Sequence, residues 1–154
     1  MTQSVESRLR ALGVVLPVPG APQANYIPTV IVGKLIFVSG QVSIAGDGAR
    51  FVGKVGVDFS VEQGRAAARI CAINTLANLK AALGDLDRIA RMVKLTGFVN
   101  CSAEFDEPHK VINGASDFLV DVLGERGRHA RSAIGVATLP LGAAVEIEAI
   151  AEIV

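Results

Sequence analysis

Arg131 is the residue of this chain whose type and surroundings point most directly to chemistry. It stands at the start of a predicted strand, "RSAIGV", and the residues around it are small. A guanidinium is a planar fork of donors that matches a carboxylate with two parallel hydrogen bonds. Small neighbours leave space beside that fork, so Arg131 is a candidate for binding a ligand carboxylate. The alternative, which spacing alone favours, is a structural ion pair with Glu146 or Glu148.

Glu146 and Glu148 form a second candidate, two residues apart in the predicted strand "VEIEAIAEI". Side chains at this spacing point to the same face of a strand, roughly 6–7 Å apart. Two such carboxylates can polarise a water molecule or protonate a leaving group. Strands also alternate apolar and polar residues simply because one face is solvated. Spacing alone favours that solvated face.

Gly40 interrupts a strong strand pattern in "VSGQVS". Glycine weakens a strand, so its presence indicates a β-bulge, a strand end or a close approach of backbone to a ligand. A basic cluster formed by Arg126, Arg128 and His129 precedes Arg131. That cluster is either a solvated loop or a site that attracts an anion.

No metal site or catalytic nucleophile is predicted. His109 and His129 have no cysteine or carboxylate at ligand spacing. Cys71 and Cys101 form no CxxC pair, and burial as small apolar side chains is the favoured reading for both.

Composition limits the possible partners. The 154 residues include 15 basic and 15 acidic ones, no Trp, and only 5% aromatics. A balanced charge gives no general attraction to nucleic acid or anionic membranes, and few aromatics are available to stack on bases. Without a signal-like start or a run of about 18 apolar residues, we expect a soluble cytoplasmic protein of one domain, 1–154.

The pattern of elements predicts an α+β fold. Helices are expected over 4–12, from Ser60 to Gly84 with a capping box to Gln63, and over 108–124. Strands are expected on both sides of Gly33, weakly over 49–56, and over 90–101, followed by a hairpin within 127–150. This order predicts a mixed six-stranded sheet with two helices on one face. The other face mixes acidic and apolar residues, which indicates contact with another subunit.

The segments "FVSGQVS", "FVN" and "VINGASDFLVDVLGERGRHARSAIGVATLPLGAAVEIEAIA" together resemble the RidA/YjgF family over roughly residues 22–152. Residues 1–21 are then an N-terminal extension. The resemblance implies a chorismate-mutase-like fold and a homotrimer with ligand clefts between subunits. It also implies hydrolysis of reactive imine/enamine intermediates such as 2-aminoacrylate to 2-keto acids and ammonia, without a cofactor.

The same resemblance implies roles for individual residues. Arg131 would bind the substrate carboxylate and Glu146 would assist the attacking water, while Glu148 stays structural. The positions implied to contact the ligand are Tyr26, Ser39, Gly40, Asn113 and Ala133. Ala133 stands where many members have cysteine, and its backbone carbonyl is the relevant group.

Two other functions remain open from the sequence. One is an endoribonuclease or translation inhibitor, which the neutral charge and scarce aromatics disfavour. The other is a non-catalytic trimer that binds a small carboxylate or a protein partner.

Overall fold

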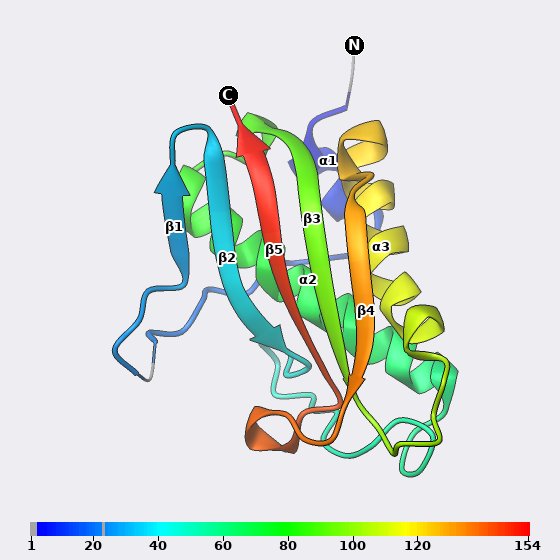
Figure 1. Ribbon diagram of the computed structural model, residues 1–154. Coiled ribbons are helices and arrows are strands. Elements are labelled where there is room, and N and C mark those ends of the chain that lie inside the picture. Colours follow the sequence, from blue (N-terminus) through cyan, green and yellow to red (C-terminus); the bar gives the residue numbers. More distant parts are fainter. Residues whose placement is uncertain (1–2, 23) are drawn as a thin grey trace.

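Five strands form one mixed sheet, and the helices pack on one of its faces (Figure 1). The computed structural model describes residues 3–22 and 24–154. The strands are β1 (Thr29–Val32), β2 (Leu35–Val42), β3 (Ile89–Asn100), β4 (Ala130–Val136) and β5 (Val145–Ile153). The helices are α1 (Val5–Ala11), α2 (Val61–Leu83) and α3 (Pro108–Leu123), with short 3-10 turns η1 (Leu86–Arg88), η2 (Gly124–Gly127) and η3 (Pro140–Gly142).

Helix α2 begins and ends where its sequence predicts. The Ser60 hydroxyl accepts a hydrogen bond from the Gln63 amide at 3.1 Å, and the Gln63 side chain accepts one from the Ser60 amide at 2.9 Å. This capping box satisfies two backbone donors that the first turn leaves free. The helix ends at Gly84, whose φ of 77° suits glycine.

The strand order is β1-β2-β5-β3-β4, which corrects the predicted C-terminal hairpin. β4 and β5 do not pair with each other, because β3 lies between them and pairs with both. The chain leaves β3, runs through α3 and returns as β4, parallel to β3. Such a parallel return needs a crossover, and the helix supplies it.

The sixth strand predicted over 49–56 is wrong. This segment makes only isolated bridges, such as Val52 with Ala143 and Val55 with Cys101. Gly53 and Gly56 adopt φ values of 140° and 86°, which break the extended backbone that a ladder requires.

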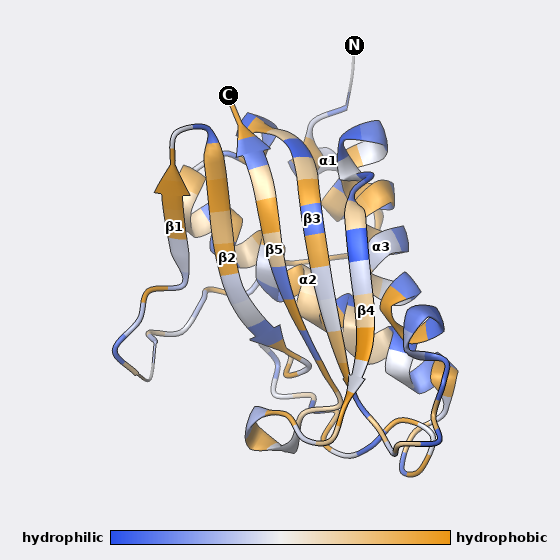
Figure 2. Ribbon diagram, in the orientation of Figure 1, coloured by the Kyte–Doolittle hydropathy of each residue, from blue (hydrophilic) through white to orange (hydrophobic). Residues whose placement is uncertain are grey.

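No helix or strand of the described residues covers the opposite face of the sheet (Figure 1). Phe37 of β2 is 40% exposed and Ile134 of β4 is 45% exposed. Strand β1 is apolar over most of its length, as Figure 2 shows, and Val30 is 45% exposed. Apolar surface of this kind on a sheet face is typical of a contact with another chain.

Candidate functional site

Arg131 lies on the edge strand β4 and turns toward α3. Its Nη1 donates to the side-chain oxygen of Asn113 at 2.8 Å and to the Ser116 hydroxyl at 3.2 Å. Its Nη2 donates to the backbone carbonyl of His109 at 3.3 Å. Asn113 and Ser116 are three residues apart on α3, so both face the same guanidinium.

All three acceptors around Arg131 are neutral oxygens. The ion pairs among the described residues do not include Arg131, so the predicted alternative of a structural ion pair with Glu146 or Glu148 is wrong within the chain. A guanidinium has five N–H donors, and three of them are used here. The remaining donors, one on Nε and one on Nη2, have no acceptor among the described residues. Nε and Nη2 are adjacent nitrogens of the fork that pairs with a carboxylate.

The basic cluster predicted before Arg131 is divided among separate partners. Arg126 pairs with Asp87 at 3.2 Å and donates to the Ile89 carbonyl at 2.9 Å. Arg128 pairs with Glu125 at 3.0 Å. Of the three cluster residues, His129 alone is linked to Arg131 through a shared partner, the Ser116 hydroxyl. These contacts favour a structural loop over a free anion site.

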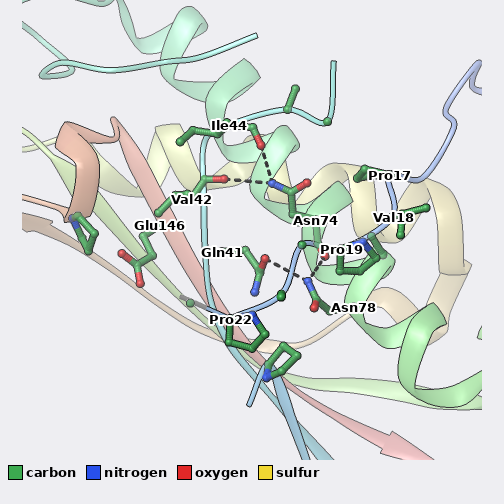
Figure 3. A pocket seen from close by; sticks show the side chains of 18 of the residues that line it. Pro17, Val18, Pro19, Pro22, Gln41, Val42, Ile44, Asn74, Asn78 and Glu146 are labelled. Atoms are coloured by element: carbon green, nitrogen blue, oxygen red, sulfur yellow. Dashed lines mark hydrogen bonds between the residues drawn. The ribbon is translucent and has the colours of Figure 1, made fainter. Parts of the chain in front are cut away.

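A second group of predicted residues lines a hollow of about 510 Å³ beside β2 (Figure 3). Tyr26, Gly40 and Glu146 all lie on its wall. β1 pairs with β2 only as far as Val38, so the second half of β2 is a free edge. The residues 17–22 form another wall of the hollow.

Gly40 and Glu146 approach each other so closely that a side chain at position 40 would displace the Glu146 carboxylate. A Cβ built on Gly40 would lie 2.8 Å from Cδ of Glu146 and closer still to its Oε1. The pairing of β2 with β5 shifts register between Val38 and Gln41, which is the β-bulge that the glycine predicted. The bulge therefore brings the backbone of Gly40 against a carboxylate.

Partial burial raises the pKa of Glu146, and repulsion from Glu148 raises it further. Both acids lie between inward-facing residues of β5, so they share the uncovered face, as predicted. Glu148 is exposed, whereas Glu146 is half-buried. A carboxyl group with a raised pKa can hold a proton nearer to neutral pH than an ordinary one.

Two asparagines of α2 fix the end of β2, and the sequence reasoning missed both. Asn74 donates from Nδ2 to the carbonyls of Val42 at 3.2 Å and Ile44 at 2.9 Å. Asn78, only 6% exposed, donates from Nδ2 to the side-chain oxygen of Gln41 at 3.1 Å, as Figure 3 shows. A buried asparagine in an apolar helix stripe must find partners, and that was the available signal.

Two further predicted residues, Ser39 and Ala133, neither line the hollow nor bond to Arg131. The Ser39 hydroxyl donates to the carbonyl of Ile27 at 3.1 Å, so it holds the segment that carries Tyr26. Ala133 packs against the core on β4, two residues beyond Arg131.

Arg131 and Glu146 do not meet within one chain. Their strands are separated by β3, and Arg131 pairs with Leu95, which in turn pairs with Ala149. This places Arg131 two strand spacings, about 10 Å, to the side of β5 and three residues, about another 10 Å, along it from Glu146. Arg131 also bonds to α3 on the covered face, whereas Glu146 points to the uncovered one. The chain thus carries the candidate residues in two separated groups, one around Arg131 and one around Glu146, which we name half-sites.

Other kinds of site find no support in the described part of the chain. Residues 3–22 and 24–154 contain no group of three or more His, Cys, Asp or Glu side chains placed to hold a metal ion. Their helices include none with the length and apolar character needed to cross a bilayer.

Comparison with known proteins identifies relatives along almost the whole chain. Residues 6–153 match the family described as "YjgF/chorismate_mutase-like, putative endoribonuclease". Protein TCP17 of Trypanosoma cruzi is 48% identical over 150 residues, which cover 97% of this chain and 94% of that protein. The crystal structure of Atu1372 from Agrobacterium tumefaciens, a protein of unknown function, has a TM-score of 0.91 and 51% identity, covering 97% of this chain and 92% of that one. E. coli TdcF, solved with bound serine, has a TM-score of 0.61 and 26% identity, covering 90% and 94%.

Proposed function

This chain belongs to the YjgF/chorismate mutase-like (RidA) family, and from that premise we propose that it hydrolyses reactive imine/enamine intermediates of the 2-aminoacrylate type to 2-keto acids and ammonia. The observation that supports this most is the state of Arg131. Its charge meets only neutral oxygens, and donors on Nε and Nη2 have no acceptor among the described residues. Such a guanidinium is prepared for an external carboxylate, and a 2-imino acid brings one.

The two half-sites lead us to propose that each active site forms between two copies of the chain. Arg131 lies at one edge of the sheet and the hollow with Glu146 lies beside the free edge of β2, toward the other. A contact that joins different surfaces of identical chains repeats around a ring if the rotation closes. We propose a ring of three, in which the uncovered sheet faces with Phe37 and Ile134 become buried.

In this arrangement the Arg131 of one chain holds the substrate carboxylate, and the Glu146 of the next chain lies near the imine carbon. Holding the substrate in one place makes the addition of water an oriented step. Water forms a C–O bond to the imine carbon, and one of its protons passes through the Glu146 carboxyl to nitrogen, which gives a carbinolamine. The second water proton then reaches nitrogen by the same group as the C–N bond breaks, which leaves the 2-keto acid, ammonia and Glu146 in its starting state. The raised pKa of Glu146 suits this proton transfer. The reaction changes no oxidation state.

The test is the rate of imine hydrolysis, with the imine generated from an amino acid by an oxidase and trapped as its semicarbazone. We expect Arg131→Ala to lower kcat/KM about 10²-fold or more, because a charged anchor is lost. Arg131→Lys should recover little, since lysine lacks the planar fork. Full activity in Arg131→Ala would contradict the proposal.

Binding of a small carboxylate without turnover is the second candidate function. The serine in E. coli TdcF favours it, because serine carries a carboxylate but no imine. Calorimetric binding of pyruvate that depends on Arg131, combined with no acceleration of imine hydrolysis, would select this function instead.

A further inference from the structure

Arg131 is the end of a continuous chain of hydrogen bonds that passes through two residues without an implied role, Ser116 and His129. The Ser116 hydroxyl lies 3.2 Å from Nη1 of Arg131 and 2.9 Å from Nε2 of His129. The other ring nitrogen, Nδ1, lies 2.6 Å from the backbone carbonyl of Gly127. This series of hydrogen bonds therefore links helix α3, the edge strand β4 and the turn η2.

When His129 is neutral, the chemistry of the two ends fixes the direction of every hydrogen bond in this series. Arginine only donates, so the Ser116 oxygen accepts from Nη1. The Gly127 carbonyl only accepts, so Nδ1 of His129 carries a hydrogen. A neutral imidazole has one N–H, which leaves Nε2 as an acceptor, and the Ser116 hydroxyl must donate to it. With a neutral ring, each group therefore has one role as donor or acceptor in each of its hydrogen bonds.

The surroundings of His129 support its neutral form. Burial lowers the pKa of the imidazole, the hydrogen bond to Gly127 acts in the opposite direction, and repulsion from Arg131 lowers the pKa further. Arg131, two residues further along the chain at the start of β4, is the charged side chain that acts on the ring. A protonated ring would present a hydrogen on Nε2 to the hydroxyl that already accepts from the guanidinium.

We propose that Ser116 and His129 are positioning residues that hold the Arg131 guanidinium in one orientation. This inference rests on the proposed function, in which Arg131 binds the substrate carboxylate. With both Nη1 hydrogens bound, by Asn113 and Ser116, the guanidinium cannot turn its Nε and Nη2 edge away from the site. His129 acts only through Ser116, by fixing where the hydroxyl hydrogen points. A preorganised fork loses less freedom on binding, so the carboxylate binds more tightly.

Two pairs of variants test this series of hydrogen bonds. The measured quantity is the affinity of the protein for pyruvate, determined by calorimetry. Ser116→Ala and His129→Leu should each weaken binding about tenfold, the effect of one hydrogen bond to a charged group. Ser116→Thr keeps a hydroxyl and His129→Gln keeps an acceptor, so both should recover most of the affinity. Ser7→Ala, on α1, is the matched control and should bind as the natural chain does.

The double variant Ser116→Ala/His129→Leu distinguishes two cases. Either His129 acts on Arg131 only through Ser116, or the two residues affect Arg131 independently. If His129 acts through Ser116, the double variant should bind pyruvate no more than about twofold worse than Ser116→Ala alone. Losses that multiply, or natural affinity in both single variants, would overturn the proposal. For imine hydrolysis the losses should lie mainly in KM, with a smaller change in kcat.

Nitrogen-15 NMR of the imidazole gives a test that needs no catalysis. At pH 7 we expect His129 to be the neutral tautomer that carries its hydrogen on Nδ1, with Nε2 unprotonated. An Nε2-protonated ring or an imidazolium would overturn the proposed chain. Pyruvate binding that depends on Ser116 and Arg131, without imine turnover, would support the proposed positioning role of Ser116 and His129. The same result would refute the proposed hydrolysis of imines. Pyruvate binding unchanged in Arg131→Ala would overturn both.

Discussion

Arg131 and Glu146 lie on opposite faces of one sheet, with β3 between their strands. Arg131 is bonded to α3 on the covered face, and Glu146 faces the uncovered side beside Gly40. The chain separates the group that would hold a carboxylate from the group that would move a proton. In the proposed function, a small substrate meets both groups where two chains come together.

The contact between Gly40 and Glu146 predicts the effect of a single added methyl group. In Gly40→Ala the new Cβ would lie 2.8 Å from Cδ of Glu146, so the carboxylate must rotate away. A displacement of about 1 Å at a reacting group can cost about 10²-fold in rate, and we expect that loss in kcat/KM. Because the obstacle is a side chain that can rotate, the melting temperature should change little. Natural activity in Gly40→Ala would show that the position of Glu146 is irrelevant.

The raised pKa of Glu146 predicts that this residue lowers stability at neutral pH. Burial and the nearby Glu148 favour its protonated form in the folded chain. The stability linked to this proton is fully present below the unfolded pKa of about 4.3 and is lost as pH rises through the folded pKa. Glu146→Gln should therefore be more stable than the natural chain at pH 7.5, with the advantage shrinking toward pH 4.

Urea unfolding at both pH values and one protein concentration measures this difference. Glu104→Gln, at an exposed loop position, is the control for loss of a negative charge. An advantage of Glu146→Gln that grows as the pH falls would contradict the prediction.

The contact between α2 and α3 depends on a glycine and predicts a strong effect on stability. A Cβ on Gly114 would lie 2.7 Å from the backbone carbonyl carbon of Arg65, which cannot rotate away as a side chain can. Gly114→Ala must push the two helices apart, and overpacking of this kind costs about 1–3 kcal/mol. Gly20→Ala, where a Cβ meets nothing within 4 Å, should lie within about 0.5 kcal/mol of the natural chain in urea unfolding. Equal stability of the two variants would show that the helices adjust freely.

Local sequence patterns predicted the positions of most helices and strands, but they did not predict which strands pair with one another. Ser60 and Gln63 marked the start of α2, because a capping box is a local pattern. The adjacency of β4 and β5 along the chain suggested a hairpin, but pairing with β3 decides their positions, and no local pattern reports a crossover. The segment with Gly53 and Gly56 has strand-like residues, yet its backbone angles prevent a ladder.

The resemblance named candidate residues and a cleft between subunits, which stay predictions, whereas the strand order that separates Arg131 from Glu146 was predicted wrongly. Glu146 and Gly40 were both recognised, and the structure places them in contact. Ser116 was missed, because one serine in a helix carries no signal until the fold brings it beside Arg131 and His129. The separation of Arg131 from Glu146 follows from strand order, which the hairpin prediction had wrong.

The central claim, that each site takes Arg131 from one chain and Glu146 from the next, is tested most directly by mixing two inactive variants. Arg131→Ala and Glu146→Gln chains are each purified, unfolded and refolded together in equal amounts. In a ring that assembles at random, about a quarter of the sites receive both natural residues, so imine hydrolysis should return to about a quarter of the natural rate. No activity in the mixture, with the mixed ring confirmed by mass spectrometry, would contradict the account.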